Sequence, residues 1–110
     1  MKSLLPSLRA KKRYIAFEVI SDYHFNKEEA YNAIKDSVKS YIGTLGLSES
    51  GLMSIDIWHN NKGIIKVNHH KINLIKAALT LTNNINNKKA MIRTLGISGI
   101  LNKAQKKYLI

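Results

Sequence analysis

The sequence predicts a single α+β domain over residues 1–110, of the ferredoxin-like type, with a four-stranded antiparallel sheet, two helices on one face and an additional C-terminal helix. Stretches that alternate apolar and polar residues, typical of strands, lie between stretches whose apolar residues recur every three or four positions, typical of helices. Their order is strand, helix, strand, strand, helix, strand, helix, and the first six elements match the ferredoxin-like pattern. A chain of 110 residues, 45% of them hydrophobic, is long enough to bury one core.

A basic arm, residues 1–12, precedes the first predicted strand. Pro6 disfavours a helix before it. The end of the arm carries four closely spaced cations: Arg9, Lys11, Lys12 and Arg13. The strand follows directly, over residues 13–21, and its buried face is expected to carry Ile15, Phe17 and Val19. Because the arm runs straight into a strand, its charges are held at one place on the domain, where we expect them to contact phosphates.

The first helix is predicted from Asn26 to Ile42. Asn26 is a good N-cap, and Glu29 stands three residues on, at the capping-box position. Gly43 and Gly46 are expected to end the helix. The side chains expected to face the sheet recur at helical spacing: Ala30, Ile34, Val38 and Tyr41.

A hairpin and a second helix are predicted next. The strands are residues 52–60 and 63–69, joined by the strong turn chemistry of Asn60 and Asn61. In the second of these strands Ile65 and Val67 are expected to point inward, with Ile64, Lys66 and Asn68 outward. The helix begins near residue 70, and an asparagine cluster at residues 83–87 is expected to end it. Its buried stripe is Ile72, Ile75, Ala78, Leu79 and Thr82.

The last predicted strand leads into a basic terminal helix over residues 99–110. Ala90, Ile92 and Thr94 fall on one face of the strand, and Met91, Arg93 and Leu95 fall on the other. Ser98 can cap the helix that follows. An arginine beside a flexible turn and a helix N-terminus is expected to form a phosphate site. The first and last strands of a ferredoxin-like sheet are neighbours, so we also expect Arg93 on the same sheet surface as Tyr14, close to the arm. The alternative is an ordinary strand-to-helix turn in which Arg93 reaches into solvent.

The net charge points to a polyanionic partner. The chain has 18 Lys and Arg against 7 Asp and Glu, a formal net charge of +11 and a pI near 10.0. Nucleic acid is the first candidate and an anionic membrane surface the second. The absence of cysteine excludes disulfides, thiolate zinc sites and cysteine nucleophiles. No apolar run approaches the ~20 residues of a membrane span, so we expect a cytoplasmic protein with no membrane partner.

The residues do not predict a catalytic centre. RNA-recognition domains share the predicted fold, but the positions where they carry base-stacking aromatics hold Ile64 and Lys66 here. Glu18 and Asp56 are carboxylates that we place together on the open sheet face, although nothing marks them as an acid–base pair. Adjacent strand residues point to opposite faces, so neither His69 and His70 nor any other pattern predicts a metal site.

Both ends of the chain carry motifs of one known family. Residues 5–15 read Leu-Pro-Ser-Leu-Arg-Ala-Lys-Lys-Arg-Tyr-Ile and resemble the opening of archaeal ribonuclease P protein component 2, the Pop-five family. Residues 93–99 read Arg-Thr-Leu-Gly-Ile-Ser-Gly and resemble that family's closing signature. The middle is also similar, in residues 77–79 and in the hairpin that ends at His69. The resemblance therefore spans nearly the whole chain in the right order.

This resemblance implies a non-catalytic subunit of ribonuclease P, the endoribonuclease that removes the 5′ leader of precursor tRNA. It implies that the RNA component carries the active site and its magnesium ions, with no cofactor bound by this chain. The implied partners are ribonuclease P RNA, the TIM-barrel-like thirty-kilodalton subunit, other ribonuclease P proteins, a second copy of the chain and, indirectly, precursor tRNA. Two alternatives remain open: an RNA-binding protein of another ribonucleoprotein such as the ribosome, and a stand-alone nuclease.

Charge and position, rather than the resemblance, select the candidate site residues. The predicted RNA-binding residues are Arg9, Lys11, Lys12, Arg13, Arg93, Lys103, Lys106 and Lys107. The predicted protein-interface residues are apolar side chains that the two-helix sandwich does not cover: Met91, Leu95, Ile100 and Leu101. In the alternative interpretation the terminal helix covers these apolar residues within the same chain.

Overall fold

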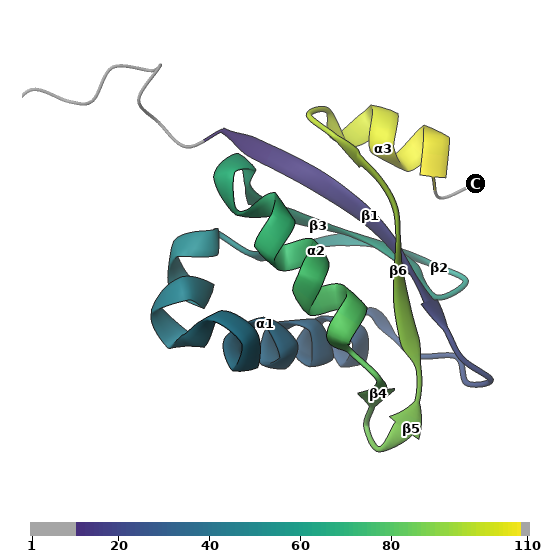
Figure 1. The fold of residues 1–110 in the computed structure, drawn as a ribbon. Helices are drawn as coiled ribbons and strands as arrows, with labels where there is room; N and C mark the ends of the chain where they lie inside the picture. The colour runs from purple at the N-terminus through teal and green to yellow at the C-terminus, as the bar shows by residue number, and fades with distance from the viewer. Residues whose placement is uncertain (1–10, 109–110) are drawn as a thin grey trace, which may run out of the picture.

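The computed structural model describes residues 11–108 and contains the predicted four-stranded antiparallel sheet (Figure 1). Its strands are β1 (Lys12–Ile20), β2 (Met53–His59), β3 (Lys62–Asn68) and β6 (Met91–Ser98). They lie in the order β2-β3-β1-β6, which places the first and last strands side by side. This order and the antiparallel pairing match the ferredoxin-like arrangement, so the predicted fold class is confirmed.

The helices cover both faces of the sheet (Figure 1). They are α1 (Lys27–Ser50), α2 (Ile72–Leu81) and α3 (Leu101–Tyr108), and a single 3-10 turn, η2 (His69–Lys71), leads into α2. The main core lies between the sheet and the helices α1 and α2, where Ile15, Ile34 and Ile75 are fully buried. The predicted inward residues of β3, Ile65 and Val67, belong to this core. We call this side the two-helix face.

The first helix is longer than predicted. Its N-terminus is as expected, with the side chain of Asn26 and that of Glu29 forming both bonds of a capping box. Gly43 interrupts the regular helix, with φ 79° and ψ 173°, but the chain resumes a helical course as far as Ser50. The true end is Gly51, whose φ of 64° is the left-handed conformation that glycine adopts at no steric cost. The predicted break at Gly43 is therefore confirmed, because two helical segments meet there at a kink. The expectation that helical structure stops at Gly43 and Gly46 is wrong, because a second segment continues to Ser50.

Two asparagine pairs form tight turns. Asn60 and Asn61, with φ of 49° and 59°, join β2 to β3 as predicted, because asparagine tolerates the left-handed region. Asn86 and Asn87, with φ of 52° and 65°, do the same for two short strands that the sequence did not predict. These are β4 (Asn84–Ile85) and β5 (Lys88–Lys89). The asparagine cluster therefore ends α2 and also builds a second hairpin.

The opposite side of the sheet, which we call the α3 face, has its own small core. The side chains of Ala16, Ile64 and Ala104 are buried there, with α3 packed across the sheet. Ile64 points away from the two-helix face, as predicted, but α3 covers it on the other side of the sheet. An irregularity opposite Ala16 and Phe17 leaves Leu95 as an extra residue in β6. Leu95 consequently stays on the α3 face while Ile97 returns to the main core.

Candidate nucleic-acid interface

One group of predicted RNA-binding residues lies on α3. Lys103, Lys106 and Lys107 are all exposed, and their spacing places them on the outer surface of the helix. The underside of α3 consists of Leu101, Ala104 and Tyr108, which pack on the sheet. No acidic residue occurs within Leu101–Tyr108, so the three charges are not neutralised within the helix. We call Lys103, Lys106 and Lys107 the lysine ridge.

A glycine in β6 sets how closely α3 approaches the sheet. The ring of Tyr108 lies so close above Gly96 that a Cβ atom at that position would overlap Tyr108 Cζ, Cε1 and the hydroxyl oxygen. The last turn of α3 therefore packs directly on the backbone at position 96, where glycine has no side chain. At the other end of the helix, the Ser98 hydroxyl accepts a hydrogen bond from the Ile100 backbone N–H at 3.1 Å. This bond closes a turn ahead of α3, because Ile100 precedes the helix and its own carbonyl accepts the Ala104 N–H. The predicted capping role of Ser98 is therefore wrong, since its hydroxyl accepts no N–H from within the helix.

The end of the basic arm is anchored to the end of β3. The backbone carbonyl of Lys11 accepts a hydrogen bond from His69 N–H at 2.6 Å. The ammonium group of Lys12 donates to Asn68 Oδ1, and the guanidinium group of Arg13 lies beside Gly99. These three cations are therefore held against the folded domain. Arg9 and the rest of the predicted arm lie outside the described residues.

Arg93 does not join the arm. It points to the α3 face as predicted, but its strand partner is Glu18, four residues along β1 from Tyr14. At ~3.3 Å per residue this separates the two positions by about 13 Å. The prediction that Arg93 lies close to the arm is therefore wrong. Its role as an RNA contact stays a prediction.

The predicted phosphate seat beside the α3 N-terminus is also not formed. Arg93 lies five residues before Ser98 in β6, about 16 Å along an extended strand. Its guanidinium Nη2 instead donates to Glu18 Oε1. The side chain is 62% exposed, so the alternative interpretation, in which Arg93 reaches into solvent, is confirmed.

The two carboxylates considered for catalysis lie on different sides of the sheet. Glu18 pairs with Arg93 on the α3 face, whereas Asp56 accepts a hydrogen bond from Lys27 Nζ, at the start of α1, at 2.7 Å. This hydrogen bond and the charge of Lys27 lower the pKa of Asp56 below its usual value. The expectation that Glu18 and Asp56 share one face is wrong. Among residues 11–108, no three His, Asp or Glu side chains gather in a way that could hold a metal ion.

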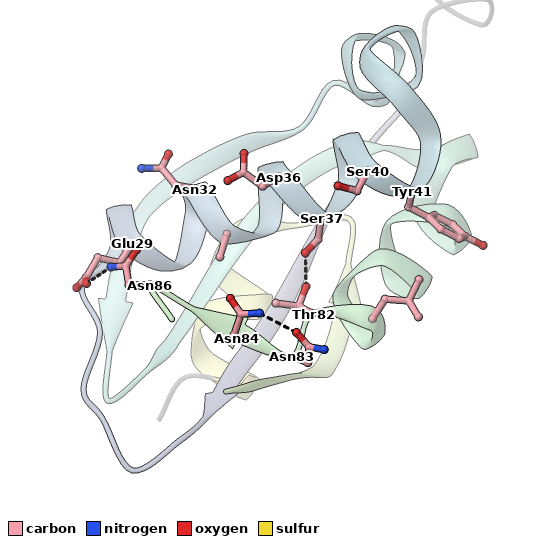
Figure 2. Close-up of a pocket in the computed structure, with 12 residues that line it drawn as sticks. Glu29, Asn32, Asp36, Ser37, Ser40, Tyr41, Thr82, Asn83, Asn84 and Asn86 are labelled. Carbon is pink, nitrogen blue, oxygen red and sulfur yellow. Dashed lines mark hydrogen bonds between the residues drawn. The ribbon is translucent and has the colours of Figure 1, made fainter. Parts of the chain in front are cut away.

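A polar cleft of about 460 Å³ lies on the two-helix side, between α1 and the segment from Leu81 to Asn86 (Figure 2). Its walls are tied together by hydrogen bonds from Asn86 to Glu29 and from Thr82 to Ser37. No Lys or Arg lines it, and its charged side chains are Glu29 and Asp36. The α1 helix carries four of the seven acidic residues of the chain, Glu28, Glu29, Asp36 and Glu49. The cleft itself is accordingly unsuited to RNA phosphates.

The four predicted interface residues fall into two pairs. Leu95 and Leu101 are partly buried in the small core under α3. Met91 is 60% exposed and Ile100 is 52% exposed. The sequence could not make this division, because it depends on where α3 lies.

Two lysines that were not predicted as RNA contacts also reach the α3 face. Lys66 pairs with Tyr14, and Lys62 pairs with Glu18, so both point to the same side as the lysine ridge. The outward position of Lys66 was predicted and is confirmed, whereas Lys62 lay in the predicted turn, one residue before the predicted strand.

Membrane-spanning helices were searched for as well. None of the helices between residues 11 and 108 combines the length and the hydropathy that a membrane span requires.

Comparison with known proteins identifies similar chains. Residues 13–109 match the Rpp14/Pop5 family. Ribonuclease P protein component 2 of Methanosarcina mazei is 38% identical over 109 residues, covering 99% of this chain and 93% of that protein. The protein of the same name from Pyrococcus furiosus is 38% identical over 109 residues, covering 98% and 91%. A chain in the cryo-EM structure of yeast ribonuclease MRP shares the fold, with a TM-score of 0.68 over 83% of this chain and 76% of that one, at 11% identity.

Proposed function

The chain belongs to the Rpp14/Pop5 family, and from this membership we propose that it is a protein subunit of ribonuclease P, acting in removal of the 5′ leader of precursor tRNA. One observation carries the proposal: relatives named ribonuclease P protein component 2 align with 99% of the chain at 38% identity. This agreement covers the fold, the basic end of the arm and the α3 segment together. It favours ribonuclease P over the ribosome or a stand-alone nuclease as the setting in which the chain acts.

The chain's own contribution is electrostatic and structural. A net charge of +11 suits a protein that binds a folded RNA and offsets the repulsion between its phosphates. The lysine ridge and the anchored cations Lys11, Lys12 and Arg13 supply such contacts on the α3 face and at the adjoining end of the sheet. In this proposal the RNA component performs the cleavage with its own magnesium ions, and the protein stabilises the RNA conformation that cleaves.

The protein partners are a finer part of the proposal. We expect the chain to contact the TIM-barrel-like thirty-kilodalton subunit and other ribonuclease P proteins, and to self-associate. Of the four predicted interface residues, Met91 and Ile100 are the two that can touch a partner, because each side chain is more than half exposed. Leu95 and Leu101 would then support that surface from beneath rather than touch the partner.

Reconstitution tests the proposal. Ribonuclease P RNA and its partner proteins are mixed with precursor tRNA at limiting magnesium, with and without this chain, and release of the 5′ leader is measured. We expect cleavage to increase with the chain present, and no cleavage by the chain alone. Cleavage by RNA-free protein that is abolished in Asp56→Ala would support the nuclease alternative instead. Equal cleavage with and without the chain would contradict the proposed function.

A further inference from the structure

One row of charged side chains crosses three strands at the end of the sheet beyond α3. Lys62 is paired with Glu18 across β3 and β1, and Glu18 is paired with Arg93 across β1 and β6. Residues that are directly paired in a sheet point to the same face, so all three lie on the α3 face. We call Lys62, Glu18 and Arg93 the transverse row. Its single carboxylate lies between two cations.

The ion pair inside this row is easily exchanged. The side chain of Arg93 is 62% exposed and that of Glu18 is 23% exposed. A pair this accessible to water contributes little to the free energy of folding, because solvent screens it. A guanidinium group binds a phosphate through charge-assisted hydrogen bonds that can be bidentate. A phosphate can therefore replace Glu18 as the partner of Arg93 with little loss of folding stability.

The surroundings of the row favour a polyanion. The Ser21 hydroxyl donates to the Lys89 carbonyl at 2.7 Å, which fixes the β4–β5 hairpin beside the end of β1. Lys88 and Lys89 are both exposed there, and Asp22 is the other acid nearby in the chain. Cations thus outnumber acids at this end: Lys62, Lys88, Lys89 and Arg93 against Glu18 and Asp22. The lysine ridge lies on the same face of the sheet, so one RNA backbone can reach both.

We propose that the transverse row binds a phosphate of the RNA backbone between Lys62 and Arg93, and that Glu18 occupies the place of this phosphate in the free protein. The inference rests on the proposed function for the identity of the RNA, and adds a specific site with its own internal competitor. Glu18 keeps Arg93 oriented on the sheet before RNA arrives. It also raises the cost of binding any phosphate there, which limits non-specific association by a chain of net charge +11.

Replacement of Glu18 tests the competitor role. The chain is titrated with ribonuclease P RNA and, separately, with a short oligouridylate, at several salt concentrations. Glu18→Gln should tighten binding of both RNAs by about threefold or more at low salt, the scale of one phosphate contact. Asp56→Asn is the matched control, because it removes the same charge from an ion pair elsewhere on the molecule. Equal effects of the two variants would mean that only net charge matters, and would overturn the proposal.

Replacement of the cations tests the site itself. Arg93→Gln and Lys62→Gln should each weaken binding and lower the salt slope by up to ~0.7–0.9. Lys39→Gln, on the exposed surface of α1, is the matched control and should change the slope less. The gain from Glu18→Gln should shrink in the Arg93→Gln background. If it persists undiminished there, Glu18 does not act through Arg93 and the proposal fails.

Two further controls separate the possible failures. Thermal unfolding of each variant establishes that it is folded, and Glu18→Thr, which suits a strand, serves as a second variant without the charge. Failure of the wild type to prefer ribonuclease P RNA would count against the proposed function, whereas the oligouridylate titration still tests the row. Unchanged RNA affinity in Glu18→Gln, together with weakened binding to a partner protein, would assign this surface to a protein and overturn the inference.

Discussion

The ring of Tyr108 in α3 rests on Gly96 in β6, with no room between them for even a methyl group. This contact joins the last turn of the terminal helix to the sheet and so positions the lysine ridge. Gly96→Ala should therefore displace Tyr108 and destabilise the domain by about 1–3 kcal/mol, as overpacking does elsewhere. Urea denaturation measures the change in stability, and hydrogen exchange should show faster exchange of α3 amides than of β1 amides.

The double variant Gly96→Ala/Tyr108→Ala is the control for this prediction. Removing the ring opens the space that the new methyl group needs. The effect of Gly96→Ala should therefore be smaller in the Tyr108→Ala background than alone. Additive effects would show that the methyl group acts on the strand itself, for example through its conformation, and not through the helix.

The lysine ridge is expected to bind phosphates. Replacing Lys103, Lys106 and Lys107 together with Gln should weaken binding to ribonuclease P RNA and lower the salt slope by up to ~0.7–0.9 for each phosphate that is no longer neutralised. Stability should change little, because all three side chains are exposed and their helix remains seated through Ala104. Titration at several salt concentrations measures the affinity and the slope, and urea denaturation measures the stability.

A triple variant on the two-helix side is the matched control for the ridge. Lys35, Lys39 and Lys76 are exposed on α1 and α2. Changing them to Gln removes the same total charge from the face that carries the acidic residues of α1. If this variant weakens RNA binding as much as the ridge variant, the ridge has no special role and general charge explains the affinity.

The cations at the end of the arm form a separate test. Lys11→Ala, Lys12→Ala and Arg13→Ala in one chain should weaken RNA binding and reduce the salt slope, again by up to ~0.7–0.9 for each phosphate left without its cation. The fold should survive, because the Lys11 anchor is a backbone hydrogen bond to His69 that the substitution leaves in place. Circular dichroism shows whether the variant is folded, and filter binding at several salt concentrations measures its RNA affinity and salt slope. A variant that stays folded with unchanged slope would place the RNA elsewhere on the α3 face.

Asn61 is expected to be important for stability. It is buried in the β2–β3 turn, its side-chain oxygen accepts from Phe25 N–H at 2.9 Å, and its amide donates to the Tyr23 carbonyl at 2.8 Å. Asn61→Ala removes both bonds and places alanine in the left-handed region, so it should cost about 2–4 kcal/mol. Asn60→Ala, at the exposed neighbour with a similar φ, loses only an exposed hydrogen bond to His59 besides the conformational part, and should cost about 1–2 kcal/mol. Chemical denaturation of both variants compares them, and equal costs would show that the two side-chain bonds contribute nothing.

Local patterns in the sequence predicted much of the fold. Alternation of apolar residues predicted β1, β2, β3 and β6 to within a few residues, because a strand has two faces and one of them is buried. Asn26 and Glu29 predicted the start of α1, since a capping box uses only neighbouring residues. Gly43 predicted a break that the structure contains, but a glycine does not show that a second helical segment follows it, as far as Ser50.

The candidate site was predictable only in part. The cations of the arm and of α3 were visible as charge clusters in the sequence. Lys62 and Lys66 were missed because their charge is isolated along the chain and becomes significant only beside β1. Whether Ile64 and Leu95 are covered could not be predicted either, because it depends on how α3 folds back onto the sheet.

The α+β class, the basic character and the family to which the chain belongs could all be read from the amino-acid sequence, because each is set by composition, local periodicity or short motifs. The pairing of Arg93 with Glu18, rather than with the arm, emerged from the folded structure alone. The register between β1 and β6 joins residues 75 positions apart and is fixed by the packing of both faces, including the extra residue Leu95. Such pairing is a property of the whole sheet, and for that reason no local pattern in either strand could reveal it.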